Sequence, residues 1–243
     1  MNSRFLALTA AGGATIIYGL NHTIAKAVMP DYVGAFGFIF FRTAGAAILF
    51  WAVSFFLPNE TIDRKDYLRF FMTALLGMCI NMLSFFKGLE LSTPVNSGIF
   101  ATTNPIIILL LSYIFLKEKI GVRKFLGIGL GFAGALMLVL YGTENSAKSP
   151  NVLLGNMLFM VNSIFFSSYI IMVKPLTKKY HTITIMKWLF LMGFIMTFPI
   201  TVGEFSVINW SDLPFNIVWR ILFVIVGTTF LTYLLNLFAL KNL

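Results

Sequence analysis

The sequence predicts an all-α polytopic membrane protein, with eight transmembrane helices present of an expected ten, arranged as two inverted five-helix repeats. Composition, the length of the apolar segments and an internal repeat lead to this prediction. The 243-residue chain is 58% hydrophobic and 11% charged, with a mean hydropathy of +0.88, which no soluble globular domain shows. Eight segments reach or approach the roughly 20 apolar residues that a helix needs to cross a bilayer. These predicted spans cover residues 6–28, 33–57, 67–88, 95–116, 124–141, 152–174, 182–203 and 215–238.

The internal repeat relates the third span to the eighth and the first to the sixth. Residues 69–89 (RFFMTALLGMCINMLSFFKGL) align with residues 220–240 (RILFVIVGTTFLTYLLNLFAL) at an offset of 151. Residues 18–26 (YGLNHTIAK) align with residues 166–174 (FSSYIIMVK) at an offset of 148. Five spans separate each segment from its counterpart, and because five is odd the second copy must be inverted. Inverted repeats are typical of transporters that open alternately to the two sides of a membrane.

This repeat divides the chain into a first unit over residues 1–141 and an incomplete second unit over residues 152–243. The second unit would contain helices six to eight, and helices nine and ten would be missing. Adding the 151-residue offset to the end of the first unit predicts a complete chain of about 292 residues.

The distribution of basic residues predicts the orientation of the chain. With a cytoplasmic N-terminus, 13 of the 18 Lys and Arg residues lie on the inner side and four on the outer side, with Arg42 inside the second span. This asymmetry follows the positive-inside rule. The net charge of +9 therefore orients the protein and requires no nucleic-acid partner.

Small and polar residues recur at helical spacing along one face of four spans. Such a face is costly in lipid unless it meets protein or water, so these helices either line a shared interior or pack closely, with Ser and Thr bonding to their own backbone. For Asn21, His22 and Asn81 we favour the interior lining. The four faces are Thr15, Gly19, His22 and Lys26; Gly77, Asn81, Ser84 and Gly88; Ser163, Ser167, Ile170 and Lys174; and Thr228, Thr232, Leu235 and Ala239.

Residues 96–140 (NSGIFATTNPIIILLLSYIFLKEKIGVRKFLGIGLGFAGALMLVL) resemble the end of an EamA-type repeat of the drug/metabolite transporter superfamily. The first span carries Tyr18-Gly19 with Asn21, which is similar to the family's Trp-Gly element with Tyr in place of Trp. Phe41-Arg42 resembles the family's arginine in span two. The elements that match within residues 96–140 are the mid-helix Pro105, Glu118 at the end of span four, a short basic loop, and Gly127 and Gly134.

This resemblance implies ten helices in two inverted halves, both termini in the cytoplasm, and export of small metabolites. It assigns structural roles to Pro105, which kinks span four, and to Glu118. In span five, Gly127, Gly131 and Gly134 allow close approach of neighbouring helices.

Arg42 lies nine residues into span two, about 14 Å deep at 1.5 Å per residue. A charge at that depth costs at least about 2.5 kcal/mol, and no Asp or Glu lies within a span interior. Two roles are open. Arg42 either snorkels or bonds to backbone carbonyls, or it faces the cavity and attracts a carboxylate or phosphate of the substrate.

Two or more roles stay open for three further features: His22, the residues around Pro105, and the aromatic side chains near the polar faces. His22 either titrates near neutral pH and couples protons to transport, or stays neutral in a hydrogen bond. Pro105 frees a carbonyl one turn back, that of Ala101, which Thr102, Thr103 or Asn104 would satisfy unless they contact substrate. Aromatic side chains near the polar faces either line the cavity or pack in the core; they are Phe85, Phe100, Tyr169, Trp188 and Tyr233.

The candidate substrate-cavity residues therefore come from seven of the spans. They are Tyr18, Asn21, His22, Arg42, Asn81, Ser84, Phe100, Thr103, Asn104, Ser163, Ser167, Tyr169, Trp188, Thr228, Thr232 and Tyr233. No metal-ligand spacing, nucleophile elbow, Walker loop or dinucleotide fingerprint is present in the sequence, so we expect no catalytic residues, metal or cofactor.

The sequence thus predicts a multi-pass secondary-active transporter of a bacterial inner membrane, with the lipid bilayer and a small-molecule substrate as its partners. The substrate is expected to be a small organic metabolite, amino acid-like or anionic, moved outward by alternating access. A cation or multidrug exporter is the alternative within transport. A membrane-embedded lipid-modifying enzyme and a structural membrane protein are the alternatives from other classes.

Overall fold

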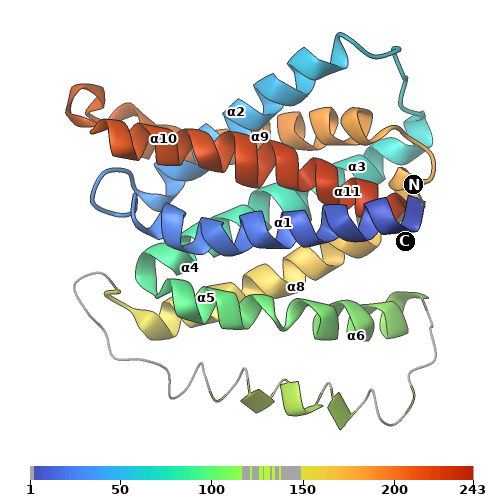
Figure 1. Ribbon diagram of the computed structural model, residues 1–243, viewed down its shortest axis with the longest axis horizontal. Coiled ribbons are helices and arrows are strands. Elements are labelled where there is room, and N and C mark those ends of the chain that lie inside the picture. The colour runs from blue at the N-terminus through green and yellow to red at the C-terminus, as the bar shows by residue number, and fades with distance from the viewer. Residues whose placement is uncertain are drawn as a thin grey trace.

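The computed structural model describes residues 3–116, 121, 126–127, 129–131, 133–134, 137 and 149–242. Every regular element in this described part of the chain is helical. The helices run side by side along the long axis of the molecule (Figure 1).

The helices before residue 117 form the first group. They are α1 (Ser3–Lys26), α2 (Ala35–Ser54), the short η1 (Arg64–Asp66), α3 (Tyr67–Ala74), η2 (Leu75–Ile80), α4 (Asn81–Leu91), α5 (Pro94–Ala101) and α6 (Asn104–Leu116). The second group follows residue 151. It contains α8 (Val152–Thr177), α9 (Thr182–Ser206), the short η3 (Trp210–Asp212), α10 (Phe215–Phe223), η4 (Val224–Leu231) and α11 (Thr232–Asn242).

Three helix starts are fixed by side chains that accept a hydrogen bond from a backbone N–H of the first turn. Thr93 precedes α5 and is followed by Pro94, Asn151 precedes α8, and His181 precedes α9. These caps satisfy N–H groups that have no partner inside the helix, and proline is favoured at the first helical position because it has no N–H to satisfy.

Six helical stretches of the described chain are long and apolar enough to cross a membrane: Ala35–Ser54, Arg64–Leu91, Pro94–Phe115, Val152–Thr177, Thr182–Ser206 and Phe215–Asn242. Each coincides with a span predicted from the sequence. The first predicted span, 6–28, is helical as α1 and has 24 residues, but it is not among the six apolar stretches. The fifth predicted span, 124–141, lies largely outside the described residues.

Span four breaks where Pro105 predicts a kink. Helix α5 ends at Ala101 and α6 begins at Asn104. The hydroxyl of Ser163 on α8 donates to the carbonyl oxygen of Phe100 (3.2 Å), and that of Ser167 donates to the carbonyl oxygen of Asn104 (3.3 Å). The neighbouring helix α8 therefore bonds carbonyls at the break, of which that of Phe100 also accepts from the hydroxyl of Thr103 (2.6 Å). Neither is the carbonyl of Ala101, which the sequence indicates.

A π-helical segment interrupts the third span and the last one. Segment η2 lies between α3 and α4, and η4 lies between α10 and α11. The N–H of Asn81 bonds the carbonyl of Leu76, and that of Thr232 bonds the carbonyl of Gly227, in both cases five residues back. Each span thus accommodates an extra residue without ending.

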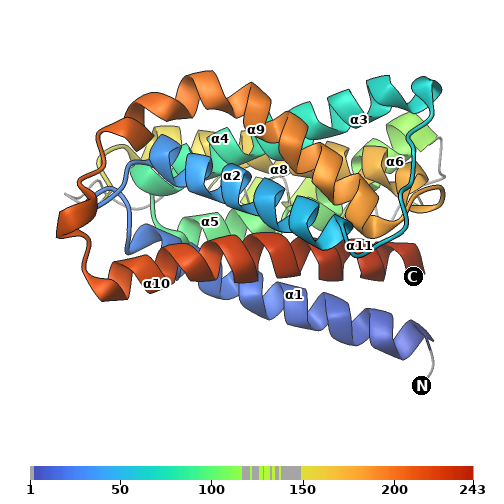
Figure 2. The same ribbon diagram turned by 90° about the horizontal axis from the view of Figure 1, so that it is seen from above.

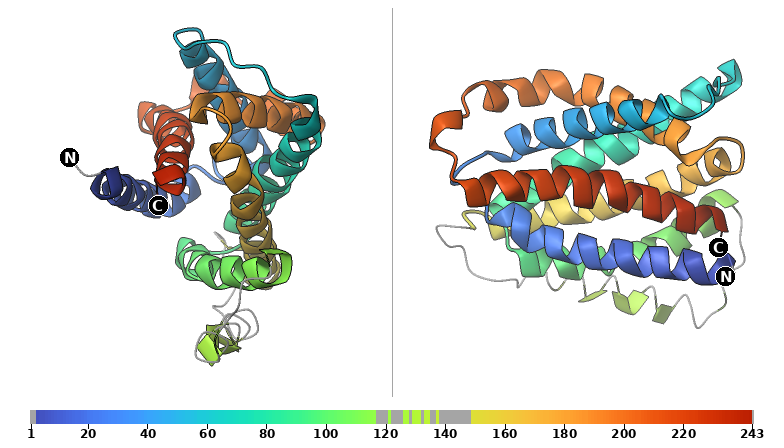
Figure 3. Two further views of the ribbon diagram at one scale, coloured as in Figure 1. Left: turned by 90° about the vertical axis from the view of Figure 1, so that its right-hand side faces the viewer. Right: turned by 45° about the horizontal axis from the view of Figure 1, so that its top comes forward.

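Helix α2 packs along α9, α4 packs against α8, and α1 packs against α11. Figure 2 shows α1 at one edge, alongside α10 and α11, and both views in Figure 3 show α5 and α6 at the opposite side from α2. The core is rich in buried aromatic rings from α2, α4, α8 and α9, including Phe38, Phe50, Phe86, Phe159 and Phe190.

Both ends of the α2–α9 pair are tied by polar contacts. At one end, the carboxylate of Glu204 accepts hydrogen bonds from the N–H groups of Phe36 (2.8 Å) and Gly37 (3.0 Å) at the start of α2. At the other end, Lys179, just before α9, pairs with Asp63 and with Asp66 (2.6 Å), at the short η1 that follows the α2 loop and precedes α3. The hydrogen bonds to Asp63 and Asp66 raise the pKa of Lys179 above its ordinary value.

Candidate functional site

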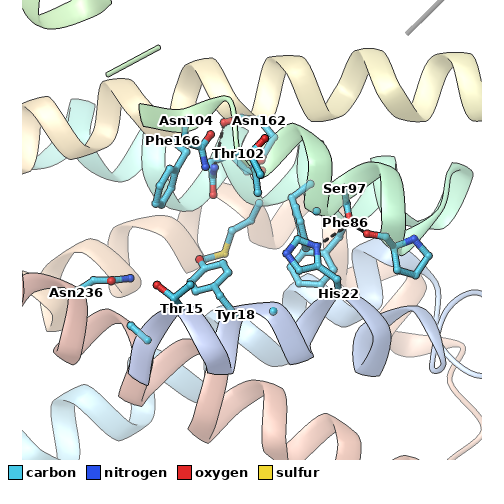
Figure 4. Close-up of a pocket in the computed structure, with 18 of the residues that line it drawn as sticks. Thr15, Tyr18, His22, Phe86, Ser97, Thr102, Asn104, Asn162, Phe166 and Asn236 are labelled. Carbon is cyan, nitrogen blue, oxygen red and sulfur yellow. Dashed lines mark hydrogen bonds between the residues drawn. The ribbon is translucent and has the colours of Figure 1, made fainter. Parts of the chain in front are cut away.

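A cavity of about 870 Å³ opens between α1, α2, α4, α5, α6, α8 and α11. Its volume lies within the range of small-molecule binding sites. Figure 4 shows Tyr18, His22 and Thr15 pointing into it from α1, facing Ser97, Asn104 and Asn162 on the opposite helices. The polar side chains on the lining are Thr15, Tyr18, His22, Thr23, Arg42, Asn81, Ser97, Thr102, Asn104, Asn162 and Asn236, and the aromatic ones include Phe85, Phe86 and Phe166.

Arg42 brings a positive charge to this lining. Its side chain is 3% exposed, and its Nη2 donates a long hydrogen bond (3.4 Å) to the carbonyl oxygen of Thr228 in η4. Its guanidinium lies over the ring of Phe86, 5.1 Å from the centroid. Its Nε is buried and has no partner among the described residues. Arg42 therefore bonds a backbone carbonyl, which is one of the two roles that the sequence leaves open. A guanidinium has five N–H donors, and this contact uses only one of them.

No carboxylate balances that charge on the described lining, which contains no Asp or Glu. An isolated buried charge is costly. The contact with Phe86 and the Thr228 carbonyl offset part of this cost. The site is consequently suited to an anion, which would supply the missing acceptor oxygens.

His22 is held by a hydrogen bond on the same lining. Its Nδ1 lies 2.6 Å from the hydroxyl oxygen of Ser97, which in turn donates to the carbonyl oxygen of Pro94 (2.8 Å). The imidazole meets the ring of Phe85 edge-on at 5.5 Å. The ring is therefore fixed in orientation by α5 and α4.

Asn81 and Asn162 bind each other across the cavity wall. The side-chain amide of Asn81 donates to the carbonyl oxygen of Asn162 (3.3 Å), and that of Asn162 donates to the carbonyl oxygen of Asn81 (3.1 Å). Both residues line the cavity. This reciprocal pair joins α4 to α8.

Of the sixteen cavity residues predicted from the sequence, the structure brings five onto this lining: Tyr18, His22, Arg42, Asn81 and Asn104. The other eleven lie elsewhere. They are Asn21, Ser84, Phe100, Thr103, Ser163, Ser167, Tyr169, Trp188, Thr228, Thr232 and Tyr233.

Many of these eleven make contacts within or between helices. Ser163 and Ser167 bond the carbonyls at the break in span four. Thr228 and Thr232 donate to carbonyls of their own helix, at Val224 and Gly227. Asn21 is fully buried, and both polar atoms of its side chain lack a partner among the described residues.

The aromatic members of the eleven pack against other rings. Trp188 meets Trp51 at 5.5 Å, Tyr169 meets Tyr233 at 6.2 Å, and Phe100 meets Phe159 at 6.0 Å.

The sequence interpretation did not single out Asn162, Ser97, Phe86 or Asn236. Asn162 was missed because its counterpart in the first repeat, 148 residues earlier, is Ala14, so a search for repeated polarity passes over it. An Asn within a membrane span was nevertheless a usable signal, because buried polar groups in membranes are costly.

The predicted structural residues fall partly within the described chain. An added Cβ at Gly131 would lie 2.3 Å from Ile106 Cδ1, whereas nothing described lies within 4 Å of one at Gly127 or Gly134. Glu118 lies outside the described residues. Within the described part, no group of three or more His, Cys, Asp or Glu is placed to hold a metal ion.

Comparison with known proteins places this site in context. Residues 5–140 match the profile of the EamA-like transporter family. The chain is 27% identical to the uncharacterized transporter YetK of Bacillus subtilis, over 71% of this chain and 52% of that protein. It is 30% identical to an uncharacterized transporter of Methanothermobacter thermautotrophicus, over 68% and 52%. A WAT1-related protein of Arabidopsis thaliana, At3g53210, is 24% identical over 70% and 51%.

The chain therefore spans about half the length of these curated relatives. A solved crystal structure superposes on 97% of this chain and 79% of its own, with a TM-score of 0.61 and 14% identity. This likeness concerns the fold alone.

Proposed function

This chain belongs to the EamA-like transporter family of the drug/metabolite transporter superfamily, and from that premise we propose that it moves a small organic anion or zwitterion by secondary-active transport with alternating access. It is a multi-pass membrane protein. We further propose a bacterial inner membrane, a cytoplasmic N-terminus and outward transport.

The observation that carries the proposed substrate class is Arg42. Its guanidinium is buried, borders the 870 Å³ cavity and has no acidic partner among the described residues. A planar group with several donors matches a carboxylate or phosphate. A cation or multidrug exporter would be expected to place a carboxylate near its substrate, and the described lining contains only neutral and basic polar groups.

Alternating access is proposed from the inverted repeat, with units over residues 1–141 and 152–243. Three pairs of features support it. The π segments η2 and η4 occupy corresponding stretches of spans three and eight. Gly45 on α2 meets Ile225 of η4, and Gly193 on α9, 148 residues later, meets Met78 of η2. Spans one and eight pack together, as do spans six and three.

The test is transport by full-length protein reconstituted in liposomes, with a panel of carboxylates, amino acids, neutral amides and quaternary ammonium ions. We expect carboxylate-bearing solutes to be transported. Arg42→Gln should lower their transport by about 10- to 100-fold, and Arg42→Lys less, because lysine keeps the charge but loses the planar fork.

Lys187→Gln is the matched control. Lys187 is a buried cation over Trp51, 5.0 Å from the ring centroid, and is not on the cavity lining. Its loss should leave transport near the wild-type rate. Normal transport by both Arg42 variants at matched expression would contradict the proposed site. Turnover of lipid without net movement of solute would instead favour the membrane-embedded enzyme.

A further inference from the structure

Two basic side chains lie at the two ends of an aromatic pair on the cavity wall. His22 meets Phe85 edge-on (5.5 Å), Phe85 meets Phe86 at right angles (5.1 Å), and Arg42 lies over Phe86 (5.1 Å). All four residues line the cavity. One cavity is thus bordered by a fixed cation and by a side chain that can become one.

The contacts of Ser97 determine which nitrogen of His22 is available. A serine hydroxyl has one proton, and that of Ser97 is donated to the carbonyl oxygen of Pro94. Its oxygen, 2.6 Å from Nδ1 of His22, therefore accepts a hydrogen bond from Nδ1–H. In the neutral ring Nε2 then carries the lone pair. An incoming proton binds there without breaking the contact with Ser97.

We propose that His22 is the proton-binding residue of this cavity, so that an organic anion bound at Arg42 is accompanied by a proton taken up at Nε2 of His22. The inference rests on the anion site proposed above and extends it to the coupled ion. Histidine is the side chain whose charge ordinarily changes between about pH 5 and about pH 8, and the other ionisable types on the described lining are tyrosine and arginine.

The electrostatic reason is that a bound carboxylate neutralises the charge of Arg42. In the empty cavity, the charge of Arg42 opposes protonation of His22, because like charges repel strongly where water is scarce. A carboxylate bound at Arg42 cancels that charge, and the opposition is removed. By linkage, protonation of His22 must then strengthen binding of the anion by the same factor.

Other charged or titratable groups lie on α1 and on the elements packed against it. On the elements packed against α1 they are Lys87 and Glu90 on α4, Arg220 on α10, and Tyr233 and Lys241 on α11, with Arg4, Tyr18 and Lys26 on α1 itself. Lys87 pairs with Glu90 (2.8 Å). Lys26 donates to the carbonyl oxygens of Leu89, Glu90 and Ser92. Of all these groups, only Tyr18 is on the described lining, which leaves Arg42 as the cation that His22 shares it with.

The experiment is calorimetric binding of benzoate to the full-length protein in nanodiscs, in two buffers of different ionisation enthalpy, to count protons taken up per anion. Near neutral pH the wild type should take up roughly half a proton per benzoate bound. Its benzoate affinity should rise at least about 5-fold from about pH 8 to about pH 6. His22→Gln should bind benzoate with no proton uptake and less than about 2-fold pH dependence.

The chain offers a matched control, because its second histidine, His181, caps α9 outside the cavity. His181→Asn preserves a capping side chain and should keep the wild-type proton uptake. The neutral probe benzamide should show no uptake in any variant. Equal uptake by the wild type and His22→Gln would overturn the inference, as would loss of uptake in His181→Asn alone.

A second measurement needs no change at residue 22. Imidazole NMR signals, assigned with His181→Asn, should show a larger protonated fraction of His22 at fixed pH when benzoate is added. An unchanged fraction with benzoate bound overturns the proton coupling and leaves the anion site standing. Absence of benzoate binding at every pH overturns both proposals.

Discussion

The wall formed by α4 and α8 and the wall formed by α1 and α11 correspond to each other in the predicted repeat, yet different chemistry holds them. Helices α4 and α8 are joined by the reciprocal amides of Asn81 and Asn162 and approach closely at Gly155, where Gly88 lies opposite. Between α1 and α11, a Cβ added at Gly13 would lie 3.9 Å from Leu235 Cδ1, which is an ordinary contact distance. The two corresponding helix pairs thus differ in how closely they fit at a glycine. We expect α4 and α8 to move as a unit and α1 to move relative to α11.

The strongest test of this comparison replaces a glycine in each wall. An added Cβ at Gly155 would lie 2.5 Å from Ser92 Cβ and 2.8 Å from the carbonyl oxygen of Gly88, so Gly155→Ala should lower the free energy of unfolding by about 3 kcal/mol. Gly13→Ala should leave it unchanged or slightly raised. Unfolding by SDS titration in mixed micelles measures both. Similar losses in the two variants would mean that both walls are equally tight.

The next test compares two lysines related by the 148-residue offset. Lys26 donates to three carbonyl oxygens at the end of α4, at 2.7 to 2.8 Å, whereas Lys174 is exposed. Lys26→Met should lower the free energy of unfolding by about 2 kcal/mol, because charged hydrogen bonds are lost and backbone acceptors are left unpaired. Lys174→Met should cause no resolvable change. The reverse order of effects would rule out a capping role for Lys26.

A smaller effect is expected from the amide pair itself. Asn81→Ala and Asn162→Ala should each lower the free energy of unfolding by about 1 kcal/mol, in line with hydrogen bonds between membrane helices. The residue that corresponds to Asn81 is Thr232, which bonds within its own helix, so Thr232→Ala should have less effect. A double-mutant cycle of the two asparagines checks their coupling, and strictly additive losses would show that they act independently.

The smallest effect is expected at Asn21, in α1. Its buried amide has no partner among the described residues, so Asn21→Leu removes no described hydrogen bond. The free energy of unfolding should stay the same or rise by up to about 1 kcal/mol. The same SDS titration measures it, and a clear loss of stability would indicate that the amide has a partner in the membrane-embedded protein.

The sequence was a good guide to the helices and a weaker one to their interruptions. Length and apolar composition predict six helical stretches that the structure contains, because a lipid-exposed chain must satisfy its backbone within the helix. The break near Pro105 could be predicted because proline has no N–H for the helical hydrogen bond. The segments η2 and η4 were not predicted, because the polar positions of spans three and eight were assigned at regular α-helical spacing, which leaves no place for an extra residue.

Two residues that the sequence analysis singled out, His22 and Arg42, are on the cavity lining. His22 was identified on the polar face of span one, and Arg42 as a charge deep in an apolar span. The repeat was a weaker guide to the lining when it was used to transfer polarity from one half to the other. Ser163 and Ser167 were chosen by offset, and they bond backbone carbonyls of span four. The predicted repeat concerns the order of the helices, whereas the hydrogen bonds of each side chain depend on its own neighbours.

The π segment before Asn81 lengthens span three by one residue without changing the direction in which the rest of the span points. Each residue advances an α-helix by about 100°, so one extra residue in a regular α-helix would turn Asn81, Phe85 and Phe86 away from the cavity. The wider turn of η2, closed by the bond from the N–H of Asn81 to the carbonyl of Leu76, absorbs that residue. Deletion of one codon between Leu75 and Ile80 should therefore restore a regular helix and keep these three residues on the cavity wall.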